Sequence, residues 1–114
     1  MNDEALKERL NHEYLVTRLF QATKCKGPIP GHVIVDECKL HNKIELRAIV
    51  HRMRENGIPI CSSRNGYWHA NSQEEIIDTV QMLKGRAYSI LSAAYRMQKN
   101  LLDQEEIDEE LFGE

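Results

Sequence analysis

Apolar residues recur at helical spacing in three separate stretches of the chain. The first covers residues 4–23, the second covers residues 42–56, and the third runs without a proline over residues 72–102. Steps of three and four residues keep such positions on one side of a helix. The pattern therefore predicts three amphipathic helices, each with one face to bury.

The second of these helices has sequence signals at both ends. Asn42 can cap its first turn, and Glu45 can reach back to the Asn42 backbone N–H as in a capping box. Asn56-Gly57 supplies a left-handed residue at the other end, and Pro59 makes continuation costly. We expect a helix over residues 43–55 whose buried face carries Leu46, Ile49, Val50 and Met53.

The residues that follow are typical of a β-hairpin. Residues 58–63 alternate as in a short strand, and Asn65-Gly66 can take positive φ at both central positions of a tight turn. The chain returns through residues 67–69, with Arg64 at the turn. One of Tyr67 and Trp68 should pack in the core while the other faces outwards. An amphipathic helix followed by such a hairpin suits a recognition helix with a β-wing.

Two shorter elements are expected between the first and second helices. Gly27-Pro28-Ile29-Pro30-Gly31 ends the first helix with a turn, in which Ile29 suits a short strand. Residues 32–40 suit a short helix that crosses the recognition helix, although Val33-Ile34-Val35 equally suits a strand. In the first helix, residues 14–20 should pack under the recognition helix, whereas Leu6 and Leu10 extend beyond a minimal domain.

The span over residues 15–70 resembles a winged helix-turn-helix domain of the biotin-operon-repressor type. The resemblance rests on the apolar stripe of the second helix, on Arg54 before Asn56-Gly57-Ile58-Pro59-Ile60, and on Ser63-Arg64-Asn65-Gly66-Tyr67 as the wing. The longer span to Leu101 is similar to small winged-helix proteins of phages and prophages of Gram-positive bacteria. The resemblance implies an α+β fold, mostly α, that binds double-stranded DNA.

The chain departs from that family in two places. No ligase or effector domain follows the wing, so no catalytic or corepressor role is inherited. The turn Lys39-Leu40-His41-Asn42 lacks the common glycine, which leaves the angle between the two helices open.

The third helix begins at a capping-box signature, Ser72-Gln73-Glu74-Glu75, and carries a heptad seam about 39 Å long. The seam consists of Ile76, Val80, Leu83, Ala87, Ile90, Ala94, Met97 and Leu101. Four more apolar residues, Ile77, Tyr88, Leu91 and Tyr95, widen it beyond a strict two-stranded pattern. A single winged domain cannot cover this stripe. We expect a homodimer or higher oligomer; the alternative is a helix that folds back on its own domain.

Charge is unevenly distributed along the chain, whose formal net charge is −3. Residues 24–70 hold eight Lys or Arg against four Asp or Glu, as phosphate binding requires, whereas residues 103–114 hold seven acids and no base. The chain therefore divides into a winged domain over residues 1–71, a dimerisation helix over residues 72–102 and an acidic tail over residues 103–114. The tail is either disordered or a binding segment for a protein partner.

Residues that can reach DNA lie on the exposed face of the recognition helix and at the wing. They are Lys43, Ile44, Arg47, His51, Arg52, Arg54, Arg64 and Asn65. Arg47 can bind guanine bidentately in the major groove, and Arg64 can enter the minor groove or reach its backbone. Ile44 suits a thymine methyl or the core equally. Arg52 and Arg54, late in the helix, suit phosphates or surface ion pairs, with Glu55 nearby.

Other chemistry finds little support in the sequence. No phosphate loop, nucleophile elbow or paired metal ligands occur, so no enzyme, cofactor or metal site is expected. Cys38-x-x-His41 stands without a second close pair, and Cys25, Cys38 and Cys61 read as free thiols. The first residues lack the pattern of a signal peptide and no run suits a membrane span. We expect a protein of the bacterial host cytoplasm.

Two functions follow from these features. The first is a dimeric, phage-type DNA-binding protein that regulates transcription or marks a replication site. The alternative is a protein-interaction adaptor whose acidic tail or long helices recruit a replication or transcription partner, a role favoured by Glu45 within the presumed reading face and by the negative net charge.

Overall fold

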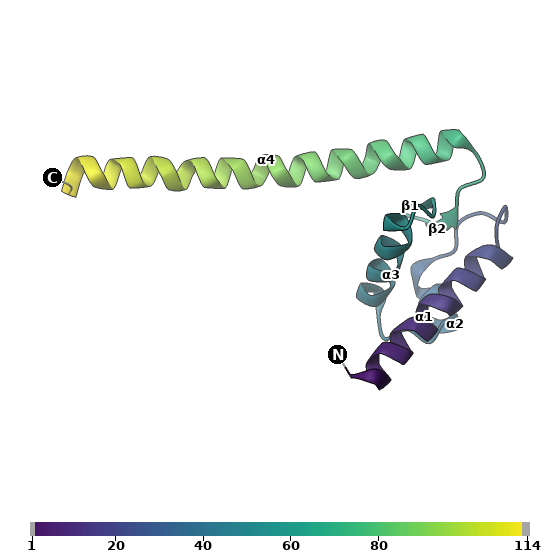
Figure 1. The fold of residues 1–114 in the computed structure, drawn as a ribbon. Coiled ribbons are helices and arrows are strands. Elements are labelled where there is room, and N and C mark those ends of the chain that lie inside the picture. The colour runs from purple at the N-terminus through teal and green to yellow at the C-terminus, as the bar shows by residue number, and fades with distance from the viewer. Residues whose placement is uncertain (1, 113–114) are drawn as a thin grey trace. The chain divides into compact units, whose positions relative to one another are not determined.

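The computed structural model describes residues 2–112, with side chains for residues 2–103. Within this range six elements follow one another: α1 (Asp3–Ala22), α2 (Gly31–Glu37), α3 (Lys43–Glu55), β1 (Ile60–Ser63), β2 (Gly66–His69) and α4 (Gln73–Phe112) (Figure 1). The fold is mostly helical with one two-stranded antiparallel sheet, which confirms the predicted α+β class. The chain forms two compact units, Met1–Thr79 and Val80–Glu114.

Helix α1 contributes one face to the core of the first unit. Asn2 caps it, because its side chain accepts a hydrogen bond of 2.7 Å from the Ala5 N–H. His12, Val16 and Phe20, each four residues apart, are buried. Tyr14, which the sequence placed in the packed half of this helix, is instead 57% exposed. It lies two positions from Val16, on the opposite side of the helix, where Arg18 contacts its ring.

Helix α3 is the centre of that core and ends as predicted. Its apolar face is buried against the other elements, and it consists of Leu46, Ile49, Val50 and Met53. The Asn42 side chain accepts the Glu45 N–H at 2.9 Å. At the other end Gly57 takes φ +82°, and the Ile58 N–H donates to the Met53 carbonyl at 3.0 Å. This left-handed cap closes the helix in the way that Asn56-Gly57 indicated.

One detail of the predicted capping box is wrong. The Glu45 carboxylate does not return to Asn42 but accepts the His41 N–H at 2.8 Å and also bonds His12. The same shift occurs at the start of α4, where Glu75 accepts the Asn71 N–H at 3.2 Å. In both places the carboxylate reaches one residue further back and also bonds a side chain from another element, which is His12 for Glu45 and Trp68 for Glu75.

The turn between α2 and α3 works without the common glycine because Lys39 takes its conformation. Segment 31–37 is a helix, which decides between the helix and the strand that the sequence left open. Lys39 then has φ +56°, and the Leu40 N–H donates to the Val35 carbonyl at 2.9 Å. A lysine in the left-handed region costs about 1 kcal/mol or more relative to glycine. The turn is thus formed at a cost in stability.

Replacing Lys39 with glycine should therefore stabilise the protein. We expect the free energy of unfolding to rise by about 0.5–1 kcal/mol, because relief of the left-handed strain outweighs the added freedom of the unfolded chain. The Lys39→Ala variant is the matched control, since it removes the same side chain and keeps the strain. Urea unfolding of the two variants decides the matter, and equal stabilities would contradict this account of the turn.

The hairpin pairs in the register Ile60 with His69, Cys61 with Trp68, Ser62 with Tyr67 and Ser63 with Gly66. Its two loop residues are therefore Arg64 and Asn65, so the predicted central pair Asn65-Gly66 is wrong by one position. Asn65 does not take positive φ, whereas Gly66 has φ +130°. The reason is a third segment: Ile29 exchanges backbone hydrogen bonds of 2.8 and 2.9 Å with Tyr67. Ile29 thus forms the short strand that the sequence suggested.

Helix α4 starts at a cap tied to the hairpin. The Ser72 hydroxyl accepts the Glu75 N–H at 3.2 Å, and the Glu75 carboxylate accepts the Trp68 indole N–H at 2.7 Å. Tyr67 instead packs against the core, so both aromatic residues of β2 have distinct structural partners. The helix continues to Phe112, beyond the end expected at residue 102. The side chains of residues 104–112, and residues 113–114, lie outside the described part, and the disordered acidic tail stays a prediction.

Two of the three cysteines, Cys38 and Cys61, serve the fold as small buried groups. Cys38 and Cys61 are buried and all three cysteines are free. Burial raises the pKa of the Cys38 thiol, with a smaller contribution from the Glu37 charge, so the thiol stays protonated and unreactive. Among the described residues, no helix is both long enough and apolar enough to cross a bilayer.

Candidate nucleic-acid interface

The face of α3 opposite the core is exposed along the whole helix. It carries Lys43, Ile44, Arg47, Ala48 and His51. Ile44 is 71% exposed, which rules out the core role that the sequence left open for it. An exposed isoleucine between two cations offers an apolar side chain of the kind that can contact a thymine methyl. The exposed face therefore combines charge with one apolar contact point.

Three cations of this region are exposed and unengaged. In the part of the chain that the structure describes, Lys43, Arg47 and Arg64 have neither a hydrogen-bond nor an ion-pair partner. Lys43 and Arg47 lie one turn apart on α3, and Arg64 lies in the loop between β1 and β2. α3 and β1 pack against one another within the first unit, so the hairpin that carries Arg64 adjoins the helix that carries Lys43 and Arg47.

Two further arginines of α3 hold the surface together. Arg52 forms an ion pair with Glu13 of α1. Arg54 donates from Nε to the Ile60 carbonyl at 2.8 Å and from Nη2 to the Ser62 hydroxyl at 3.2 Å. The first contact ties α3 to α1, and the second ties it to the hairpin. Both side chains are only partly exposed, so their positive charges support the surface more than they extend it.

The two acidic side chains of α3, Glu45 and Glu55, also have partners within the chain. Glu55 pairs locally with His51 at 3.1 Å. Burial alone would raise the pKa of the Glu45 carboxyl, but the hydrogen bond from the His41 backbone and the contact with the His12 side chain outweigh it and lower that pKa. Glu45 thus remains charged, and its carboxylate bonds His12 and the His41 backbone.

The loop of the hairpin presents Arg64 and Asn65 at its tip, where both are exposed. The Asn65 N–H donates to the Ser63 hydroxyl at 3.1 Å, which shapes the loop from within. The base of the hairpin is fixed by the Ile29 bridge and by Arg54. A long cation is therefore held on a short, braced loop beside α3.

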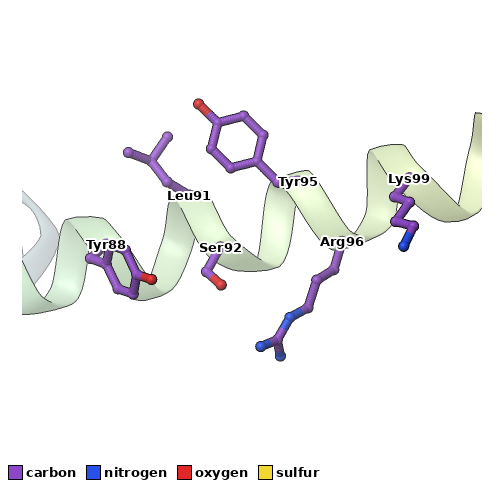
Figure 2. A pocket seen from close by; sticks show the side chains of 6 residues that line it. All are labelled: Tyr88, Leu91, Ser92, Tyr95, Arg96 and Lys99. Carbon is purple, nitrogen blue, oxygen red and sulfur yellow. The ribbon is translucent and has the colours of Figure 1, made fainter.

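The predicted oligomerisation seam is exposed along α4. Ile90 and Met97 are 70% and 73% exposed, and only Leu83 among the eight seam residues is half-buried. Figure 2 shows a second apolar group, in which Leu91 and Tyr95 project from one side of the helix near Tyr88. A single helix cannot cover its own apolar stripe, so these side chains need a partner surface to leave water.

Six of the eight predicted DNA-binding residues are exposed, and Arg52 and Arg54 are the two that brace the fold. Sequence reasoning missed two residues of α1 that position α3, namely His12, which bonds Glu45, and Glu13, which pairs with Arg52. Their signal in the sequence was weak, because both are single polar residues within an apolar helical pattern and their partners lie on another helix.

Comparisons of the chain with models of protein families, with curated proteins and with solved structures find no match.

Proposed function

We propose that this chain is a dimeric DNA-binding protein of the winged helix-turn-helix type, of phage or prophage character, that regulates transcription or marks a replication site. The order of elements supports the fold assignment: α1, the Ile29 bridge, α2, α3 and a hairpin follow one another as in that family. The Lys39 turn supports it as well, because it supplies the left-handed residue expected between the two crossing helices.

The observation that carries the proposal is the separation between engaged and unengaged cations. Arg52 and Arg54 have intramolecular partners, whereas Lys43, Arg47 and Arg64 are exposed without one. Exposed cations gathered on one helix and the hairpin beside it are the electrostatic pattern of a phosphate-binding surface. In this arrangement Arg47 reads base edges in the major groove, Lys43 binds a phosphate, and Arg64 contacts the minor groove or its backbone.

Dimerisation through α4 completes the proposal. The exposed seam supports pairing between two copies, and the wide apolar face supports a bundle that also uses the exposed Leu6 and Leu10 of α1. A dimer carries two recognition helices, which doubles the number of phosphate contacts. A dimer also raises affinity, because the second helix binds at a high effective concentration once the first is engaged.

Charges placed in the seam should separate the two copies. We expect the Ile90→Glu, Met97→Glu double variant to sediment as a monomer, because two buried carboxylates per chain cost several kcal/mol at the interface. Ser89→Glu, on a polar position of the same stretch, is the control and should remain dimeric. Analytical ultracentrifugation gives the mass directly. A wild-type protein of single-chain mass would contradict the dimer.

The DNA proposal is tested by the salt dependence of binding. With about five to ten phosphate contacts per dimer, the logarithm of the association constant should fall with the logarithm of salt concentration at a slope of about −4 to −9. Fluorescence anisotropy of a labelled duplex at several salt concentrations measures it. Binding that is absent or independent of salt would contradict the proposal and favour the adaptor function.

The adaptor function has lost one of its supports. It drew weight from Glu45 on the presumed reading face, but the carboxylate of Glu45 is held by His12 and the His41 backbone. The acidic tail remains its main support, and the side chains of residues 104–114 lie outside the described part. DNA binding is therefore the function that the described surface favours.

A further inference from the structure

Three side chains able to bind a metal meet beside the turn that leads into α3. Glu8 and His12 lie one turn apart on α1, and His41 lies just before the cap of α3. Oε1 of Glu8 lies 2.8 Å from Nε2 of His41 and 4.0 Å from Nε2 of His12. The three ligand atoms lie within 4.8 Å of one another. Donor atoms around tetrahedral zinc are roughly 3.3 Å apart, so small side-chain rotations bring all three onto one ion.

His12 is oriented for this role by a second carboxylate. Its side chain is buried, and Nδ1 bonds Oε1 of Glu45 on α3. Oε2 of the same Glu45 accepts the His41 backbone N–H at 2.8 Å, so one carboxylate fixes two of the three residues. In metal sites a carboxylate on one imidazole nitrogen sets the tautomer and directs the other nitrogen to the ion. Here the other nitrogen, Nε2, faces Glu8 and His41.

An ordinary ion pair explains only part of this arrangement. The contact between Glu8 and His41 has the length of a hydrogen bond, but 4.0 Å between Glu8 and His12 Nε2 is too long for one. One divalent cation satisfies both imidazole nitrogens and the carboxylate together. We propose that Glu8, His12 and His41 bind a divalent transition-metal ion, zinc being the best match, and that Glu45 supports the site from behind.

The ligand set favours zinc with an open position. Two imidazoles and one carboxylate form a three-ligand zinc site, in which water or another small ligand takes the fourth place. No thiolate takes part, and Co²⁺ and Ni²⁺ fit the same donors. A shallow hollow of about 330 Å³ opens beside the ligands and is also lined by Arg9 and Arg52. The fourth ligand is thus water or a small anion.

Metal binding at this place would clamp α1 to the turn that sets the position of α3. The consequence is a more stable first unit, because the ion joins His41 to two residues that lie 29 and 33 positions earlier in the sequence and are brought together only by folding. This inference does not rest on the proposed DNA binding. It concerns the stability of the fold and has its own readout.

The test is zinc binding by the full-length protein after treatment with a chelator. We expect one Zn²⁺ per chain by titration calorimetry and a melting temperature raised by about 10 °C or more at a zinc concentration about 100 times the dissociation constant. Co²⁺ in place of zinc should give the visible absorption of a tetrahedral site. Absence of binding, or binding without a rise in melting temperature, would overturn the proposal.

The variant that removes the site is Glu8→Gln, His41→Ala. Both side chains are exposed, so the fold should survive, which circular dichroism checks. The matched control is His51→Ala, which removes another exposed histidine paired with a glutamate. We expect the double variant to lose the zinc-induced rise and His51→Ala to keep it. An equal rise in wild type and double variant would show that zinc binds elsewhere and would overturn the assignment.

Discussion

Replacing Gly66 with alanine should lower the free energy of unfolding by about 3 kcal/mol or more, one of the largest effects of any single substitution in the chain. A Cβ at this position would lie 2.1 Å from the Ile29 carbonyl oxygen and 2.4 Å from its carbon. The backbone of Ile29 cannot retreat without breaking its two hydrogen bonds to Tyr67. The residue also has φ +130°, a conformation that side chains disfavour.

The control for this substitution is Gly57→Ala. Gly57 also has positive φ, at +82°, but nothing lies within 4 Å of its added Cβ. Its cost should be the conformational term alone, about 1–2 kcal/mol. Urea unfolding followed by the fluorescence of Trp68, the single tryptophan, measures both variants. If Gly66→Ala is no more destabilising than Gly57→Ala, the close approach of Ile29 to the hairpin is wrong.

The local signals in the sequence were enough for most of the helices. Asn42 and Asn56-Gly57 fixed the two ends of α3 because capping depends on residues a few positions apart. The Ile29 strand was also foreseeable, since it stands between two prolines that prevent a longer element. Short-range patterns succeed here because each of these features is determined within one turn of chain.

The failures concern contacts between distant residues. The hairpin turn was placed one position late because Ile29, far away in sequence, sets the conformation of Gly66. Tyr14 was assigned to the packed face because it was counted as one of the apolar residues at helical spacing, but an aromatic residue can also lie on the exposed face of a helix. The cluster of Glu8, His12 and His41 spans two elements, and no spacing rule joins them.

The candidate DNA-binding surface was predicted in its exposed residues but not in its internal support. Sequence alone could place Arg47 outside the core by helical periodicity and Arg64 at the turn of the predicted hairpin. It could not show that Arg52 and Arg54 bond to Glu13 and to the hairpin, because those contacts depend on the crossing of α1, α3 and β1. The structure therefore separates the two bracing arginines from the other candidates, among which the cations without a partner are Lys43, Arg47 and Arg64.

Removing Arg47 and Arg64 together should have a large effect on the affinity for DNA. The Arg47→Ala, Arg64→Ala variant loses two cations per chain, of which one is expected to read a base and the other to contact the backbone. We expect the affinity for duplex DNA at low salt to fall at least about 100-fold in a dimer, because each lost contact occurs twice. The magnitude of the salt slope should fall by about 2 for the two lost backbone contacts.

The measurement that tests the central claim most directly is a titration of labelled duplex DNA with wild-type protein, with this double variant and with Lys7→Ala, Arg18→Ala. The last variant also removes two exposed cations, but from α1. We predict strong, salt-dependent binding by wild type and control, and a loss of binding by the double variant. Equal binding by all three proteins would contradict α3 and the hairpin as the DNA-binding surface.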